Sequence, residues 1–263
     1  MAGICYNLHL MNVFGTSYML KRAKPLEPEI KSSLINFLMN RGTLDSGLVI
    51  NEFTVGDFSR RVDLAVIQSD RLLAFEVKSD ADSLIRLEGQ VEKYLQYFDK
   101  VTVVTAPKHT TKALDLTPNN VAVWEIVEDK ITIKRRGSIS QVKNKNRLIE
   151  MMTANDLYRL SKKLLISSEN KRRKTLESAL KNAPVNKLRS EAINSIKLRY
   201  KKRNAKFFKE VNMRKSTPND LALLSGTKYN NVNKLDSKQS LDCLIDSLEE
   251  LKSLIDKNSL NAA

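Results

Sequence analysis

Apolar and polar residues alternate along the first part of the chain in two different periods. Apolar residues at helical spacing within 25–40 predict a helix. Apolar runs at 48–55, 62–67 and 72–77 are typical of strands. The polar stretch 68–71 separates the last two runs, so we expect them to form a hairpin.

The pattern then returns to helix and strand. Helical spacing resumes at 82–98, and a short apolar strand follows at 101–105. A short helix is expected at 108–116, and residues 121–126 and 130–134 are typical of an added β-ribbon. The sequence therefore predicts an α/β fold whose core has the order αβββαβ and a mixed sheet. In this region we expect Trp124 to pack in the interior and His109 to lie at the surface.

Four segments are predicted along the chain. Residues 1–24 form an N-terminal extension, 25–135 the α/β core, 136–211 a helical subdomain, and 212–263 a polar linker with a final amphipathic helix. That final helix spans barely two heptads, so packing on its own chain is favoured over a coiled coil, and a homodimer is left open. The apolar residues at helical spacing in the subdomain are Leu157, Leu160, Leu164, Leu165, Leu176, Leu180, Leu188, Ile193, Ile196 and Leu198.

The charge of the chain is concentrated in one segment. The net charge is +15, but residues 1–129 hold 14 basic and 17 acidic side chains. Residues 130–215 hold 26 basic and 6 acidic side chains, a net charge of +20. Such clustering is expected of a segment that binds phosphate groups, whereas solvated basic helices are the alternative.

Two predicted strands carry the candidate chemistry. Side chains alternate across a strand, so Glu76 and Lys78 share one face, as do Arg61 and Asp63. The hairpin would hold Asp63 beside Glu76. Two carboxylates suit Mg2+ or Mn2+, and a neighbouring ammonium suits phosphodiester hydrolysis. A Glu-x-Lys triplet also arises by chance on surface strands of charged chains, so the triplet needs its context.

That context resembles a known family. Asp63, the triplet Glu76-x-Lys78, and Gln90 four residues before Tyr94 occur in the order found in the PD-(D/E)XK nuclease superfamily, in its RecB-like branch. The run Phe-Glu-Val-Lys-Ser-Asp-Ala-Asp resembles a small family of bacteria and prophages over residues 25–205. The proline that names the superfamily is absent, because Val62 precedes Asp63.

The resemblance implies a role for each matching residue. Asp63 and Glu76 would be metal ligands, and Lys78 would be the catalytic lysine. Glu29 would be the acidic residue of the first helix, although a carboxylate in a first helical turn is favoured without any such role. Gln90 and Tyr94 would support the site or contact the substrate.

The sequence thus predicts a metal-dependent nuclease, a DNA endonuclease in preference to a ribonuclease, in the cytoplasm and without a membrane segment. Cys5 and Cys243 match no zinc site or disulfide framework. The alternative is a catalytically silent regulator or partner-inhibiting protein of phage or bacterial origin that binds nucleic acid through the same fold. The residues expected to contact nucleic acid are Arg61, Arg86, Lys171, Arg172, Arg173, Lys174, Arg199, Lys201, Lys202 and Arg203.

Overall fold

The computed structural model describes residues 24–56, 60–212 and 214–225. Most of the predicted N-terminal extension and the predicted final helix lie outside these residues, as do Cys5 and Cys243. The elements are α1 (Glu27–Asn40), β1 (Leu48–Val55), β2 (Arg60–Gln68), β3 (Arg71–Lys78), α2 (Leu87–Leu95), β4 (Lys100–Thr105), α3 (Pro107–Leu116), β5 (Ala122–Val127), β6 (Lys130–Arg135), α4 (Lys145–Glu150), α5 (Ala154–Lys163), α6 (Arg173–Leu180), α7 (Val185–Glu210) and the 3-10 helix η1 (Pro218–Leu223).

The strands form one six-stranded mixed sheet in the order β1-β2-β3-β4-β5-β6. β1, β2 and β3 are antiparallel neighbours, β3, β4 and β5 are parallel, and β6 returns antiparallel to β5. The two parallel connections pass through α2 and α3, because parallel neighbours need a crossover. The predicted α/β fold with the αβββαβ order is therefore confirmed.

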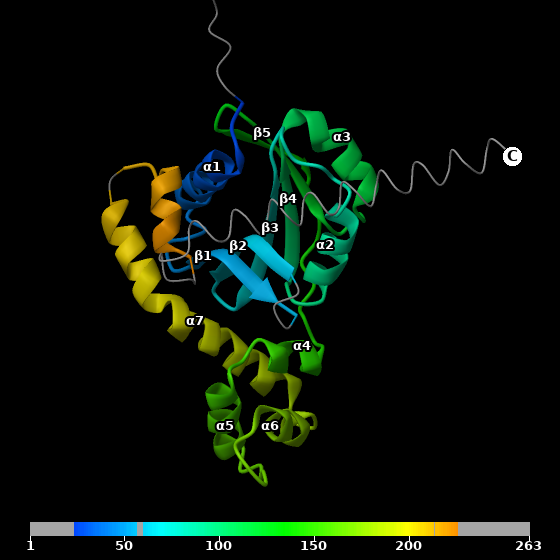
Figure 1. Ribbon diagram of the computed structural model, residues 1–263, viewed down its shortest axis with the longest axis vertical. Helices are drawn as coiled ribbons and strands as arrows, with labels where there is room; N and C mark the ends of the chain where they lie inside the picture. The colour runs from blue at the N-terminus through cyan, green and yellow to red at the C-terminus, as the bar shows by residue number, and fades with distance from the viewer. Residues whose placement is uncertain (1–23, 57–59, 213, 226–263) are drawn as a thin grey trace, which may run out of the picture.

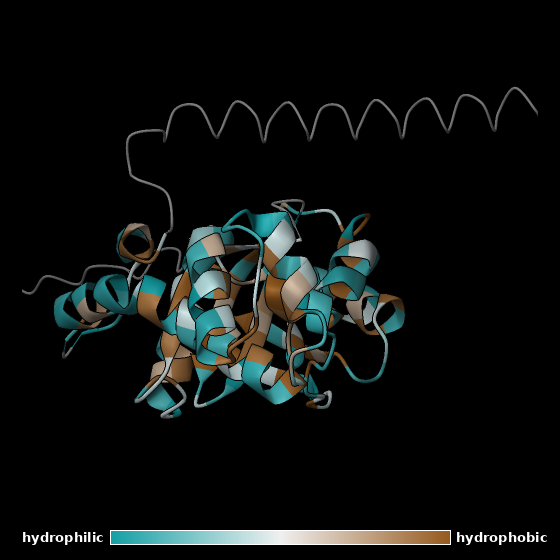
Figure 2. Cartoon of the chain, turned by 90° about the horizontal axis from the view of Figure 1, so that it is seen from below, coloured by the Kyte–Doolittle hydropathy of each residue, from teal (hydrophilic) through white to brown (hydrophobic). Residues whose placement is uncertain are grey.

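Each face of the sheet is covered by a hydrophobic core. α1, η1 and the end of α7 cover one face, and α2, α3, α4 and the start of α7 cover the other (Figure 1). Side chains of β3 alternate between the cores, with Leu72 and Ala74 on the α2 side and Phe75 on the α1 side. Figure 2 shows the apolar colour concentrated in the interior and the hydrophilic colour on the outer helices. By this alternation Glu76 and Lys78 share the α2 side.

The Asp99 carboxylate joins the sheet to the C-terminal helices. It accepts hydrogen bonds from Leu72 N at 2.8 Å and Val142 N at 2.9 Å. The Arg189 guanidinium donates to both carboxylate oxygens, at 2.9 and 2.6 Å, and to Asp70 O at 2.5 Å. Asp99 and Arg189 are both buried. The pair therefore fixes β3, α7 and the segment before α4 relative to one another.

Helix α7 runs from one core to the other (Figure 1). Ile196 of its first part packs in the α2-side core, and Phe207 near its end packs in the α1-side core. Between them, the Asn204 side chain accepts a hydrogen bond from Val49 N at 2.8 Å and donates to Val49 O at 2.9 Å. These bonds satisfy backbone groups of β1, the edge strand, and so cover an edge that would otherwise be open to pairing.

Four local expectations can be compared with the structure, and three are corrected. α2 begins at Leu87, later than predicted, because Asp82 accepts hydrogen bonds from Ser79 N and Oγ and so forms a turn after β3. His109 is buried, since α3 packs against the sheet. Leu165 and Leu198 lie outside the core, with exposed fractions of 93% and 61%. Trp124 is buried as predicted.

Replacing Asp99 by Asn should destabilise the fold by about 3 kcal/mol or more, because it leaves the buried Arg189 charge without its counter-charge. The urea midpoint of unfolding measures this loss. Lys197→Ala is the matched control, since Lys197 is also on α7 but pairs at 3.4 Å with Asp70, whose side chain is 88% exposed. Equal midpoints for the two variants would contradict this account.

Candidate metal and catalytic site

The end of β3 places a carboxylate and an ammonium side by side in the protein interior. Glu76 and Lys78 are 2% and 8% exposed, and Lys78 Nζ lies 2.9 Å from Glu76 Oε1. Their strand is held on its parallel side by β4, where Glu76 pairs with Val103 and Lys78 with Thr105. Burying two charges is unfavourable unless they are paired, and here each is the other's partner.

Asp63 is held by the backbone of β3. The β2–β3 ladder ends at the pair Leu64 and Phe75, and beyond it Asp63 Oδ2 accepts a hydrogen bond from Val77 N at 2.7 Å. The carboxylate thus replaces a ladder partner. The structure brings Asp63 and Glu76 close enough that their charges interact, as the hairpin pattern led us to expect.

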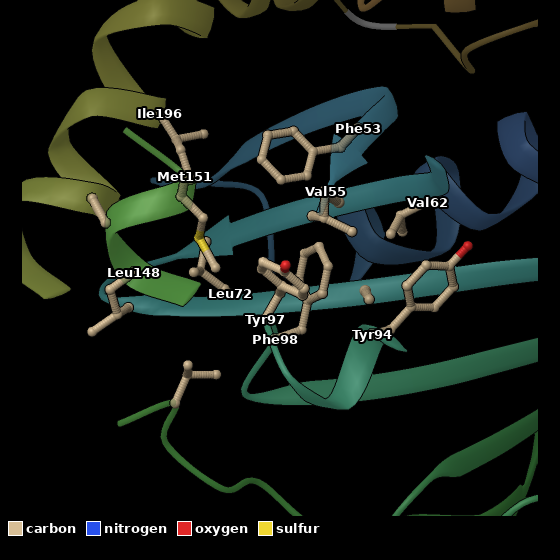
Figure 3. Packing of buried hydrophobic residues seen from close by; sticks show 14 of the residues in the cluster. Phe53, Val55, Val62, Leu72, Tyr94, Tyr97, Phe98, Leu148, Met151 and Ile196 are labelled. Carbon is tan, nitrogen blue, oxygen red and sulfur yellow. The ribbon is translucent and has the colours of Figure 1, made fainter. Parts of the chain in front are cut away.

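Tyr94 closes the site from α2. Its ring packs edge-on against Phe98 with centroids 6.3 Å apart, and its hydroxyl points out of this cluster (Figure 3). The hydroxyl oxygen lies 3.0 Å from Glu76 Oε2 and 2.7 Å from Arg61 O. A phenol has one proton, so it is shared between these two acceptors. Gln90, one turn earlier, has a buried Oε1 that finds no hydrogen-bond partner among the described residues.

A buried lysine of α1 lies at the centre of a second acidic group. Lys31 is 3% exposed, and its Nζ lies 2.5 Å from Glu27 Oε1 and 3.6 Å from Asp63 Oδ1, and also contacts Glu52. Glu27, Glu52 and Asp63 each offer an oxygen within 4.8 Å of the others. The Lys31 ammonium therefore occupies the space in which these three carboxylates could share a cation.

Glu52 reaches this group through an unusual backbone conformation. Its φ is 62°, and the neighbouring pairs Asn51 with Leu64 and Phe53 with Val62 place Glu52 opposite Asp63. A non-glycine residue in the left-handed region costs about 1 to 3 kcal/mol, and such residues concentrate at functional sites. The second oxygen of Glu52 pairs with Arg61 Nε.

The structure corrects the expectation for the first helix. Glu29 is exposed, and among the described residues its carboxylate has no hydrogen-bond or ion-pair partner, while the Ser32 hydroxyl donates to its backbone oxygen. Glu27 occupies the position near Asp63 that Glu29 was expected to fill, because Glu27 and Lys31 are four residues apart and share the inner side of α1. Sequence reasoning missed Glu27, Lys31 and Glu52. The i, i+4 spacing of the first two was a visible signal, whereas nothing in the sequence marked Glu52.

Burial and mutual repulsion set the protonation of the acidic groups. Burial and then the Glu76 charge raise the pKa of Asp63 well above its ordinary value, against the opposing effect of Lys31. Burial and the charges of Glu76 and Asp63 raise the pKa of Tyr94, so the phenol stays neutral at physiological pH.

The two lysines remain charged. Burial alone would lower the pKa of Lys78, but the Glu76 charge and hydrogen bond, then Asp63, raise it above its ordinary value. The pKa of Lys31 is likewise raised, because Asp63, Glu52 and Glu27 outweigh its burial. Both lysines thus act as fixed positive charges and not as proton acceptors.

The basic residues predicted to bind nucleic acid divide into two groups. Arg173 donates to Met152 O at 2.8 Å and pairs with Glu177, and Arg199 donates to Met151 O at 2.6 Å, so both hold the helices together. Arg61 pairs with Glu52, and Arg203 lies over the Tyr200 ring. The remaining predicted residues have exposed side chains, and they are Arg86, Lys171, Arg172, Lys174, Lys201 and Lys202.

Residues 21–225 match the protein family described as Bacteriophage P4 protein cII. The chain belongs to this family. Protein cII of Enterobacteria phage P4 is 34% identical over 230 residues, which cover 85% of this chain and 86% of that protein. These two matches confirm the part of the predicted resemblance that concerns a phage family. A solved structure, the SPO1766 protein of unknown function from Silicibacter pomeroyi, is similar with a TM-score of 0.37 at 16% identity, over 48% of this chain and 82% of that chain. Within the described part of this cII-family chain, no helix combines the length and apolar character needed to cross a membrane.

Lys31→Met should destabilise the protein by about 3 kcal/mol in metal-free buffer at neutral pH, because it leaves three carboxylates facing one another. The loss should shrink at acidic pH, since protonation removes their repulsion. Mg2+ or Mn2+ should raise the melting temperature of this variant more than that of the wild type. Lys24→Met, at a pair whose lysine is 73% exposed, should show neither effect. A variant as stable as the wild type, with no gain from cations, would argue against a cation position here.

Proposed function

We propose that this protein is a metal-dependent nuclease that hydrolyses phosphodiester bonds of nucleic acid, with DNA as the favoured substrate. One observation carries the proposal: Asp63, Glu76, Lys78 and Tyr94 converge at one end of β3, in the chain order that resembles the PD-(D/E)XK superfamily. The shared αβββαβ order supports the same conclusion. Buried charges of both signs at one strand end are costly to keep and concentrate at functional sites.

The residues present fit a hard divalent cation. Mg2+ and Mn2+ prefer carboxylate oxygens, and Glu27, Glu52 and Asp63 supply three within 4.8 Å of one another. Asp63 would be the central ligand, with Glu27 and Glu52 on the α1 side and Glu76 on the α2 side. A bound cation would supply Lewis-acid stabilisation of phosphate charge and a more acidic water.

The side chains of the chain itself would bind and orient the reacting groups. Lys78, whose raised pKa favours its charged form and whose Nζ lies 2.9 Å from Glu76, would stabilise the negative charge that develops on the phosphate. Tyr94 remains a neutral donor that fixes the orientation of the Glu76 carboxylate. The Gln90 Oε1, which has no partner among the described residues, would accept a hydrogen bond from substrate or water. In this proposal catalysis depends on preorganised charge and not on a titrating lysine.

The basic helices would bring nucleic acid to the site. Residues 130–215 carry a net charge of +20, and exposed lysines and arginines of this segment occur in the α5–α6 loop and on α7. Binding through phosphate groups would be independent of base sequence. Such binding suits a nuclease that recognises the structure of its substrate and not its sequence.

A specific observation favours a second candidate function. The Lys31 ammonium already pairs with Glu27, Glu52 and Asp63, and protein donors already contact Asp63 and Glu76. A protein of this kind could keep the fold and bind nucleic acid without turnover, as a regulator or an inhibitor of a partner. The two candidates differ in whether the site residues are needed for biological activity.

Glu76→Gln and Lys78→Met should each slow cleavage by about a hundredfold or more, because the first removes an anionic ligand of the cation and the second removes the positive charge that stabilises the phosphate in the transition state. Their affinity for nucleic acid should change little. Cleavage is measured with Mg2+ or Mn2+ on supercoiled, linear, branched and single-stranded DNA and on RNA, with a chelator as blank. Glu88→Gln, at an exposed carboxylate of α2, is the matched control and should cut normally.

If no substrate is cut by the folded wild type under any divalent cation, the nuclease proposal is wrong. If the two site variants also retain full biological activity, the regulator is favoured. Cutting that persists in both variants would place the catalytic site elsewhere.

Replacing Lys171, Arg172 and Lys174 by Ala should weaken DNA binding and flatten its salt dependence. The slope of log K against log salt should become less negative by about 0.9 for each phosphate group that the variant no longer neutralises. Arg173 is left in place because it holds Met152 O. Lys112→Ala removes an exposed charge from α3, outside the basic segment, and should leave the slope unchanged. An unchanged slope in the triple variant would show that these charges are only solvated.

A further inference from the structure

Leu165 is an apolar side chain in an exposed position. It is 93% exposed, the highest value among the exposed large hydrophobic residues of the described chain. Its neighbours Leu164 and Ile166 both pack against the core. Single exposed leucines are common on protein surfaces, so exposure alone carries no argument. The backbone of Leu165 supplies the second observation.

Leu165 adopts a backbone conformation that leucine disfavours. It follows the last turn of α5 with a φ of 56°, while Ile166 N donates to Ser161 O at 2.9 Å and closes the helix end. Most helices that end in this way have glycine at this position, and some have asparagine, because those residues enter the left-handed region at lower cost. Neither packing nor backbone preference therefore accounts for a leucine here.

Positive charges lie close to Leu165 in the sequence. Lys162 and Lys163 precede it, and Lys171 and Arg172 end the same loop. Lys162 Nζ and Lys171 Nζ lie 5.7 and 4.6 Å from the centre of the Tyr158 ring, so both ends of the loop meet at one place on α5. The loop projects at the end of the molecule away from the sheet (Figure 1). Leu165 is thus an apolar side chain in a stretch, residues 162–172, that carries four cations and one carboxylate, Glu169.

We propose that Leu165 inserts between stacked bases of the nucleic acid that the basic helices hold, an inference that rests on the nucleic-acid binding proposed above. Proteins that deform duplex DNA insert apolar side chains between base steps while cations neutralise the flanking phosphates. An anionic lipid surface also attracts lysines, but stable membrane binding requires a whole apolar helix face or a lipid chain. One leucine side chain is large enough to insert at a single base step, but it buries too little apolar surface to hold a protein on a membrane.

The test uses the full chain with a chelator, so that no strand is cut. Binding is followed with a short duplex that contains 2-aminopurine, whose fluorescence rises when its neighbours unstack. Leu165→Asn should bind about tenfold more weakly, the expected loss from burying one leucine less, and should not raise the fluorescence. Its salt slope should equal that of the wild type, because every phosphate contact is kept. Its melting temperature should be equal or higher, since asparagine relieves the backbone strain.

Two variants serve as controls. Leu165→Met keeps an apolar tip and should retain both affinity and fluorescence. Val127→Asn removes an exposed apolar residue of β5, 48% exposed and outside the basic helices, and should behave as the wild type.

If the wild type binds the duplex and Leu165→Asn binds equally well with the same fluorescence, the insertion is refuted while the proposed nuclease stands. If the wild type binds neither duplex nor single strands, nucleic-acid binding itself fails, and this inference with it. Binding to phosphatidylserine vesicles that Leu165→Asn abolishes, without any effect on the duplex, would assign the tip to lipid and overturn the proposal.

Discussion

Strand β3 is held at each end by a carboxylate from another element. Asp99 accepts the Leu72 amide at its start, and Asp63 accepts the Val77 amide at its end. The first carboxylate is neutralised by Arg189 of α7, and the second faces Lys31 of α1. The central strand, and with it Glu76, is therefore fixed by two charge networks that draw on elements from both halves of the chain. Buried charges favour this one arrangement of the elements, because any displacement of a charged partner leaves the other buried charge unpaired.

The candidate site follows from this constraint. Glu76 and Lys78 follow Leu72 and Ala74 on the same face of β3. The alternation that places the two apolar side chains in the core therefore also places Glu76 and Lys78 in the candidate site. Lys31 and Lys78 flank the acidic groups, and both stay charged. Ammonium groups buried among carboxylates would favour an anionic substrate and would compete with a cation for the same oxygens. The same arrangement supplies stability when no cation is present.

The long helix α7 links the basic helices to the site. Its first part joins the α2-side core, its end joins the α1-side core, and Asn204 covers the edge of β1 between them. Since β1 carries Glu52, one of the two carboxylates missed by sequence reasoning lies on a strand that α7 packs against. The α5–α6 loop, by contrast, projects at the end of the molecule away from the sheet (Figure 1).

The sequence by itself determined the order of helices and strands, the hairpin, and the approach of Asp63 to Glu76, because periods of 2 and 3.6 residues and a polar turn are local properties. It also placed Tyr94 on the helix that covers the site. Only the tertiary structure decided that Glu27 and not Glu29 faces Asp63, since the inward side of a helix depends on what it packs against. Only it revealed Glu52, which reaches the site through a left-handed backbone that no spacing encodes. It also separated Arg173 and Arg199, which hold the fold, from the exposed cations beside them, because identical side chains differ only in their three-dimensional neighbours.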